Sequence, residues 1–234
     1  MIEILGVKAS EYKMKHIFTK TYAELSEKAA KMILEIVKGN PYAVLGLATG
    51  TTPLGLYARM IADHEKYGTS YAHIRTVNLD EYKGLAKTHP QSYAYFMRKN
   101  LFDGLGIDPE NTNIENGMAA DEAKECARYD ALLGQLPRDI QLLGLGSNGH
   151  IAFNEPGTPF SSGTHVVTLA ESTVKDNARL FDDISEVPRK AFTMGIKQIM
   201  QAKKILILAS GANKADAVYK MVKGEVTEHV PASV

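Results

Sequence analysis

Short apolar runs alternate with amphipathic stretches along most of the chain. The first amphipathic stretch, residues 22–38, repeats apolar side chains at helical spacing with Glu and Lys between them. Similar patterns predict further helices over residues 53–66, 91–102, 120–133 and 212–223. Continuous apolar runs predict buried strands at residues 42–47, 75–80, 140–146 and 204–209. Buried strands separated by helices predict an α/β fold, with one doubly wound, mostly parallel, Rossmann-like sheet covered by helices on both faces.

Ligands of such sheets bind beyond the carboxyl ends of the strands, so the four strand ends are the first places to search. After the first strand, the loop 48–53 contains Gly50, Thr51 and Thr52 and leads into a helix. We expect Thr52 to cap that helix and Pro53 to be its first residue. Backbone N–H groups at a helix start can hold a phosphate. A tight turn with an ordinary cap fits this loop as well.

The second strand ends at Asp80, which is followed by Glu81. A partly desolvated carboxylate at a strand end can act as a general base toward a carbon acid. The alternative is a solvated acidic pair that begins a loop.

The third strand end holds His150 and Glu155 in one glycine-rich connection. A carboxylate that binds one imidazole nitrogen fixes the tautomer and leaves the other nitrogen free for a substrate proton. The alternative is a structural histidine capped by a neighbouring acid. One histidine and one glutamate supply too few ligands for a zinc site, and no HExxH-type spacing occurs.

Two cations complete the set of candidates. Lys214, after the fourth strand, falls in the first turn of a helix, where its charge opposes the helix dipole unless an anion compensates it. Arg179 could be a second cation. Either residue could instead be an ordinary surface charge.

Composition narrows the possible partners. The 234 residues include 27 Lys plus Arg and 27 Asp plus Glu, so no net field attracts nucleic acid or an anionic membrane. Cys126 is the only cysteine, which excludes an internal disulfide. No apolar run approaches the ~20 residues that span a bilayer, and the N-terminus lacks the features of a signal peptide. We therefore expect a soluble, cytoplasmic protein.

Together, several of these segments resemble the glucosamine-6-phosphate deaminases, in particular the shorter bacterial type. The segments that carry the resemblance are LGLATGTTP, NLDEY, GSNGHIAFNEPGTPF, NARLFDD and VPRKAFTMGI. The resemblance runs from about Met14 to the end, which makes residues 1–13 an N-terminal extension and residues 14–234 a single α/β domain. The family usually continues into a further strand beyond VPASV, so we expect that C-terminal strand to be missing here.

The resemblance implies conversion of glucosamine 6-phosphate and water into fructose 6-phosphate and ammonia. Asp80 would be the general base that moves a proton from C2 to C1 of the open-chain sugar. His150, oriented by Glu155, would assist opening of the pyranose ring. The implied phosphate and substrate ligands are Gly50, Thr51, Thr52, Arg179, Lys214 and Tyr93, the last in a stretch that resembles the family's mobile lid. The reaction needs no metal or organic cofactor, and the chain would be a monomer or small homo-oligomer.

Asn148 departs from the pattern. The long bacterial deaminases have an aspartate there, in a relay with the histidine. Asparagine can still hydrogen-bond, which keeps Asn148 among the catalytic candidates, but it holds no negative charge. We therefore expect Glu155, rather than a three-member relay, to be the partner of His150.

Two rival functions remain open at this point. A phosphosugar isomerase or lactonase of the same fold would keep the phosphate loop but release no ammonia. A phosphosugar-sensing domain would bind without turnover, although such domains have usually lost the acid/base set that Asp80, His150 and Glu155 form here.

We predict that N-acetylglucosamine 6-phosphate does not activate this chain. The long deaminases have basic residues of an allosteric site near two positions that are His165 and Val167 here. The measurement is the half-saturating concentration of substrate with and without that compound. A clear decrease on its addition would contradict the prediction.

Overall fold

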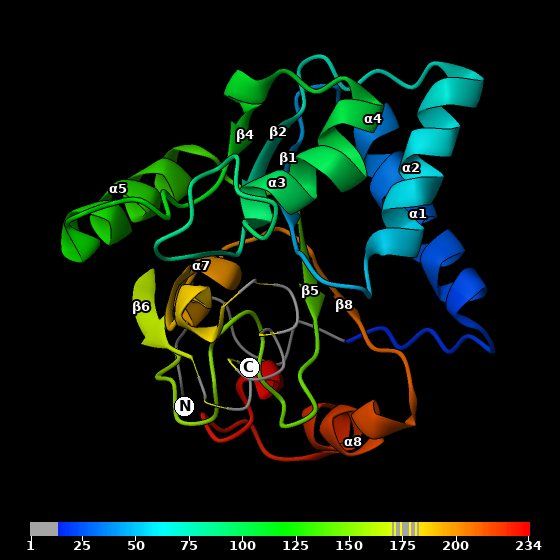
Figure 1. Ribbon diagram of the computed structural model, residues 1–234. Coiled ribbons are helices and arrows are strands. Elements are labelled where there is room, and N and C mark those ends of the chain that lie inside the picture. Colours follow the sequence, from blue (N-terminus) through cyan, green and yellow to red (C-terminus); the bar gives the residue numbers. More distant parts are fainter. Residues whose placement is uncertain (1–13, 170, 172–173, 175–177, 179–180, 182) are drawn as a thin grey trace.

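The computed structural model describes residues 14–169, 171, 174, 178, 181 and 183–234. A five-stranded sheet in the order β4-β2-β1-β5-β8 forms its centre (Figure 1). The bounds of these strands are β1 Val44–Leu47, β2 Arg75–Asn78, β4 Thr112–Asn113, β5 Ile140–Gly144 and β8 Ile205–Leu208. Every pairing in this sheet is parallel, so all its carboxyl ends lie at one edge.

Helices cover both faces of this sheet, as the sequence predicts. α1 and α2 pack side by side, and α5 lies on the opposite side of the strands (Figure 1). The longer helices are α1 Tyr22–Gly39, α2 Leu54–Tyr67, α5 Glu122–Gln135 and α8 Ala215–Lys223. The shorter ones are α3 Tyr93–Met97, α4 Asp103–Leu105 and α7 Ile196–Ile199. A π-helical turn, Arg98–Phe102, joins α3 to α4, so residues 93–105 form one continuous helical segment.

Local signals explain where the helices begin. The Thr21 side chain accepts a hydrogen bond from the backbone of Glu24 and so caps α1, and Asp121 caps α5 in the same way. The expected start of α2 is wrong by one residue. Pro53, rather than Thr52, is the N-cap of α2, and it provides no side-chain cap. The first turn of α2 therefore needs another partner for its N–H groups.

The apolar run at residues 75–80 is two strands rather than one. After β2 the chain leaves the parallel sheet, and Asp80 opens β3, Asp80–Tyr82. β3 belongs to an antiparallel sheet of order β3-β7-β6, with β6 at His165–Thr168 and β7 at Lys190–Thr193. Leu79 marks the break, because its carbonyl accepts the Met194 N–H at 2.6 Å. The continuous apolar pattern does not indicate that the chain passes here from the parallel sheet to the antiparallel sheet.

A large hydrophobic cluster between sheet and helices includes Ile33, Leu45 and Leu142, each at most 1% exposed. A smaller cluster around Tyr82, Val174 and Ala191 lies under the antiparallel sheet. In the described part of the chain, no helix is long and apolar enough to cross a membrane.

Candidate active site

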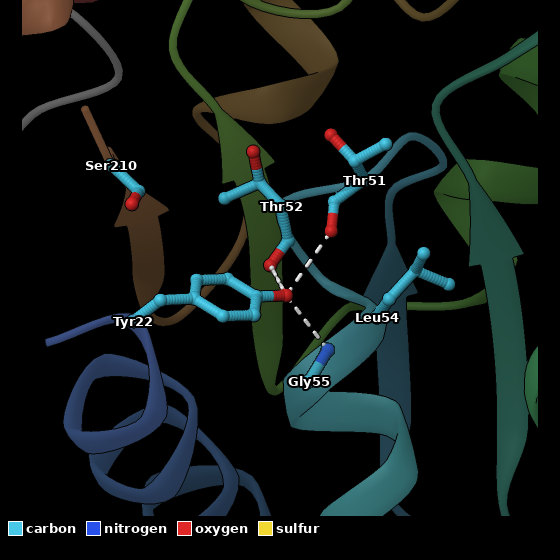
Figure 2. A pocket seen from close by; sticks show the side chains of 6 residues that line it. All are labelled: Tyr22, Thr51, Thr52, Leu54, Gly55 and Ser210. Atoms are coloured by element: carbon cyan, nitrogen blue, oxygen red, sulfur yellow. Dashed lines mark hydrogen bonds between the residues drawn. The ribbon is translucent and has the colours of Figure 1, made fainter.

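A cavity of about 530 Å³ lies at the start of α2, where the loop that follows β1 meets the end of β8 (Figure 2). Its lining residues are Tyr22, Thr51, Thr52, Leu54, Gly55 and Ser210. Gly50, just before this lining, has φ +95°, a conformation that favours glycine. The predicted loop of Gly50, Thr51 and Thr52 therefore borders this cavity. The Ser210 side chain lines it from the end of β8.

The carboxyl group of Asp80 is buried, with 7% of the residue exposed. Burial, together with the nearby Glu81 carboxylate, raises the pKa of Asp80 to about 8. This environment excludes the interpretation of Asp80 and Glu81 as a solvated acidic pair. A carboxylate with a pKa near 8 is a far stronger base than an exposed aspartate.

Glu81 is 1% exposed, and its carboxylate accepts hydrogen bonds from backbone N–H groups. The donors are Tyr82 at 2.8 Å and, at the start of α3, Tyr93 and Ala94, both at 2.9 Å. Burial raises the pKa of Glu81 to about 7, although these three N–H donors act in the opposite direction. Through these hydrogen bonds, Glu81 holds the first turn of α3 against β3, the strand that also contains Asp80.

Tyr93 is the first residue of α3 and lies near Asp80. Its hydroxyl is 3.1 Å from that of Tyr82, and its ring stacks on Phe153 with ring centroids 6.3 Å apart. Burial raises the pKa of Tyr93 well above 10, with the Tyr82 and Asp80 charges adding and the Thr49 hydroxyl opposing. Tyr93 therefore occupies the space between the loop after β1 and the buried acid.

Three side chains meet after β5. Asn148 Nδ2 donates to Glu155 Oε2 at 2.7 Å, and Asn148 Oδ1 lies 2.7 Å from His150 Nδ1. Glu155 Oε1 is 3.4 Å from the same ring nitrogen. Glu155 is a partner of His150, as expected, but the expectation that Asn148 forms no three-member connection with them is wrong, because Asn148 contacts both residues.

This arrangement fixes the histidine tautomer. A carboxylate only accepts, so the Asn148 amide must turn its NH₂ toward Glu155 and its oxygen toward His150. Nδ1 of His150 therefore carries the proton, and Nε2 presents a free lone pair. Burial lowers the pKa of His150, with Glu155 opposing and Lys214 assisting, so the ring is neutral near pH 7.

Lys214 ends a 3₁₀ turn, Ala212–Lys214, and is the N-cap residue of α8. Its charge lowers the pKa of His150, so the two side chains share one region. The predicted cation therefore lies at the same edge of the sheet as His150. Arg179, the other predicted cation, lies outside the described residues.

The structure connects the separate strand ends through Phe153. Its ring packs against Tyr82 and Tyr93, with centroids 6.2 and 6.3 Å away, and its N–H donates to Thr193. The connection that carries His150 is thus held against the strand that carries Asp80. Among the described residues, no group of three or more His, Cys, Asp and Glu could hold a metal ion.

Sequence reasoning missed four residues that shape the site: Tyr22, Tyr82, Phe153 and Glu228. Glu228 accepts the N–H of Gly157 with its carbonyl and that of Phe160 with its carboxylate, at 2.8 and 2.9 Å. It thereby holds the segment that follows Glu155. Tyr82 lies in NLDEY and Phe153 in GSNGHIAFNEPGTPF, but their positions in the sequence do not indicate that their rings are in contact.

Comparison with known proteins shows the family of this chain. Residues 19–234 match the family described as glucosamine-6-phosphate isomerases/6-phosphogluconolactonase. The chain belongs to this family. Glucosamine-6-phosphate deaminases of Clostridium perfringens and Lachnoclostridium phytofermentans are 50% and 52% identical over 94% of this chain, and it covers 92% and 94% of them.

Solved structures of the family agree with the fold. A monomeric glucosamine-6-phosphate deaminase is 50% identical, with a TM-score of 0.90, over 94% of this chain and 92% of that one. A 6-phosphogluconolactonase from Thermotoga maritima has a TM-score of 0.70 at 17% identity, over 93% of this chain and 92% of its own. At this identity, the similarity to the lactonase supports a common fold and not a common function.

The raised pKa of Asp80 has a consequence for stability. The folded chain holds this proton up to about pH 8, whereas an unfolded aspartate loses it near pH 3.8. The stabilising contribution is therefore complete below about pH 4 and is lost as the pH rises through about 8. We expect Asp80→Asn to be more stable than the parent chain at pH 9, by about 1 kcal/mol or more, because it removes a buried charge.

Urea unfolding of both chains at pH 6 and pH 9 provides the measurement. The difference between them must increase with pH. A parent chain that gains stability relative to Asp80→Asn between these two pH values would contradict the raised pKa.

Proposed function

We propose that this chain converts glucosamine 6-phosphate and water into fructose 6-phosphate and ammonia. The observation that carries the proposal is a buried carboxyl group, Asp80, on the strand against which the His150 connection packs through Phe153. In that connection, His150 Nδ1 lies 2.7 Å from Asn148 Oδ1. The reaction requires one base for a carbon acid and one acid/base group for ring opening. Identity of 50–52% to named deaminases over nearly the whole chain supports the same assignment.

The phosphate would bind where the loop of Gly50, Thr51 and Thr52 borders the cavity. Backbone N–H groups and hydroxyls of this loop supply donors, and Lys214 supplies a positive charge. Arg179 stays a second proposed ligand. Holding the phosphate fixes the remote end of the substrate, which orients its C1 and C2 atoms.

His150 would open the sugar ring. Its free Nε2 takes the proton of the C1 hydroxyl, and the imidazolium that forms then gives a proton to the ring oxygen. The bond between C1 and that oxygen breaks with its electron pair on oxygen, which leaves an aldehyde at C1. Glu155 stabilises the transient imidazolium through Asn148 and by its own charge at 3.4 Å.

Asp80 would then move one proton along the open chain. Its carboxylate removes the C2 proton, which the aldehyde makes acidic. The enolate oxygen then takes a proton from the substrate's own C2 ammonium group, which gives an enol with a neutral amine on C2. Return of the proton to C1 gives an iminium at C2. Water adds to that carbon, and the carbinolamine releases ammonia to leave the C2 ketone. Burial makes Asp80 basic enough for the first step, since its pKa is about 8.

No observation favours the rival functions. The lactonase similarity is 17% identity, and all three acid/base residues expected to be lost in a sensing domain are present. The similar monomeric deaminase supports a chain that acts as a monomer on a small-molecule substrate. A cytoplasmic location is part of the proposal, because phosphorylated sugars are retained inside cells.

The test is incubation of the purified chain with glucosamine 6-phosphate while ammonia and fructose 6-phosphate are measured. We expect both products in equal amounts. Asp80→Asn should lower kcat by about 10²- to 10⁴-fold, because the amide cannot accept the C2 proton.

Asp121→Asn is the matched control. Asp121 is exposed and caps α5, and asparagine caps equally well, so activity should be unchanged. Two results would refute the proposal: no products from a folded parent chain, or undiminished turnover by Asp80→Asn.

A further inference from the structure

Tyr22, the first residue of α1, reaches the phosphate loop with its hydroxyl (Figure 2). Three backbone groups of this loop and of the start of α2 surround that oxygen. The carbonyls of Thr51 and Thr52 lie 3.1 and 2.9 Å away, and the N–H of Gly55 lies 2.8 Å away. The sequence shows Tyr22 only as the beginning of an amphipathic helix.

The hydrogen-bonding capacity of a phenol defines what Tyr22 does here. A tyrosine hydroxyl has one proton to donate, and its oxygen can also accept. The oxygen accepts the Gly55 N–H, and the proton is shared between the carbonyls of Thr51 and Thr52. The single proton is engaged by the protein, so Tyr22 acts on the loop rather than as a donor to a ligand.

The direction of the two carbonyls matters for an anion. A phosphate is attracted by N–H groups and repelled by carbonyl lone pairs, so an anion-binding loop must turn its carbonyls away from the ligand. Tyr22 gives the Thr51 and Thr52 carbonyls a donor on the side of α1. Without that donor, these carbonyls would lose the interaction that keeps them turned toward α1.

The Gly55 contact completes the start of α2. Pro53 provides no cap there, and the Leu54 N–H is 3.3 Å from the Thr51 carbonyl. Tyr22 therefore supplies the acceptor that an ordinary side-chain cap would supply to the Gly55 N–H. It fixes the helix start that follows the loop.

The packing of α1 on α2 brings Tyr22 to this position. A Cβ atom at Gly55 would lie 3.0 Å from the Tyr22 ring and 2.4 Å from Ser26 Oγ. Glycine at this one position lets the two helices approach closely enough for the hydroxyl to reach the loop. Tyr22 is held at its own end, because it directly follows the Thr21 cap.

We propose that Tyr22 is a positioning residue for phosphate binding: its hydroxyl holds the Thr51 and Thr52 carbonyls and the Gly55 N–H so that the loop presents donors to the phosphate. The inference rests on the proposed function only for the identity of the substrate. The phosphate affinity itself can be measured without turnover.

The test is Tyr22→Phe, which removes the hydroxyl and keeps the ring against Gly55. The KM for glucosamine 6-phosphate should rise by about three- to tenfold, the size expected for one or two hydrogen bonds. The value of kcat should stay within about twofold, because the groups around Asp80 and His150 are untouched. The dissociation constant of inorganic phosphate, measured by calorimetry, should rise by the same factor as KM.

Tyr42→Phe is the matched control, since Tyr42 is 62% exposed and stacks on His73 away from the cavity. It should leave KM and phosphate affinity unchanged. If Tyr22→Phe proves too unstable to assay, Gly55→Ala replaces it: a Cβ there lies 2.4 Å from Ser26 Oγ and 3.0 Å from the Tyr22 ring, so it pushes the start of α1 away from the loop and should weaken phosphate binding in the same direction. Unchanged phosphate affinity in Tyr22→Phe, or in Gly55→Ala where it replaces that variant, overturns the inference, and so does a decrease in kcat alone.

Gly50→Ala separates this inference from the proposed function. Weakened phosphate binding in Gly50→Ala with unchanged binding in Tyr22→Phe would refute the role of Tyr22 and leave the phosphate site standing. A parent chain whose phosphate affinity decreases in Tyr22→Phe but that releases no ammonia would refute the proposed reaction and leave the role of Tyr22 intact.

Discussion

Parallel pairing of β1, β2, β5 and β8 is the constraint on which the site depends. Parallel strands end at the same edge, so loops that are far apart in sequence meet there. The loop of Gly50, Thr51 and Thr52, the Asp80 carboxyl group, the His150 connection and Lys214 each follow one of these strands. None of these groups needs a special fold of its own, because the sheet supplies the common edge and the helices on its two faces supply the stability.

Burial of acidic side chains is an energetic cost of this arrangement. Asp80 and Glu81 are adjacent acids with at most 7% exposure, and burial disfavours their charged forms. Glu81 is compensated by three backbone N–H groups, which also fix α3. The burial of Asp80 raises its pKa, and a base for a carbon acid needs that property. The same burial that lowers the stability of the folded chain when Asp80 is charged therefore makes the Asp80 carboxylate a stronger base.

Sequence patterns predicted β1, β2, β5 and β8 of the central sheet and its longer helices, because apolar periodicity records burial directly, but they did not predict the two-residue strand β4. These patterns did not predict the point at which the chain leaves one sheet and joins the other. Nothing in residues 75–80 distinguishes the parallel strand from the antiparallel one that begins at Asp80. Side-chain identity also suggested that Asn148 would break the relay, whereas the amide joins His150 to Glu155. The hydroxyl of Tyr22 could not be foreseen, because its role depends on how closely α1 approaches Gly55.

A crystal structure of the chain with 2-amino-2-deoxyglucitol 6-phosphate would test the central claim, that one edge of the sheet binds the whole substrate, most directly. This open-chain analogue lacks the carbonyl and cannot react. We expect its phosphate on the loop of Gly50, Thr51 and Thr52, and its C1 and C2 atoms against the Asp80 carboxylate. A phosphate bound elsewhere, or a C2 atom out of reach of Asp80, would contradict this position of the substrate.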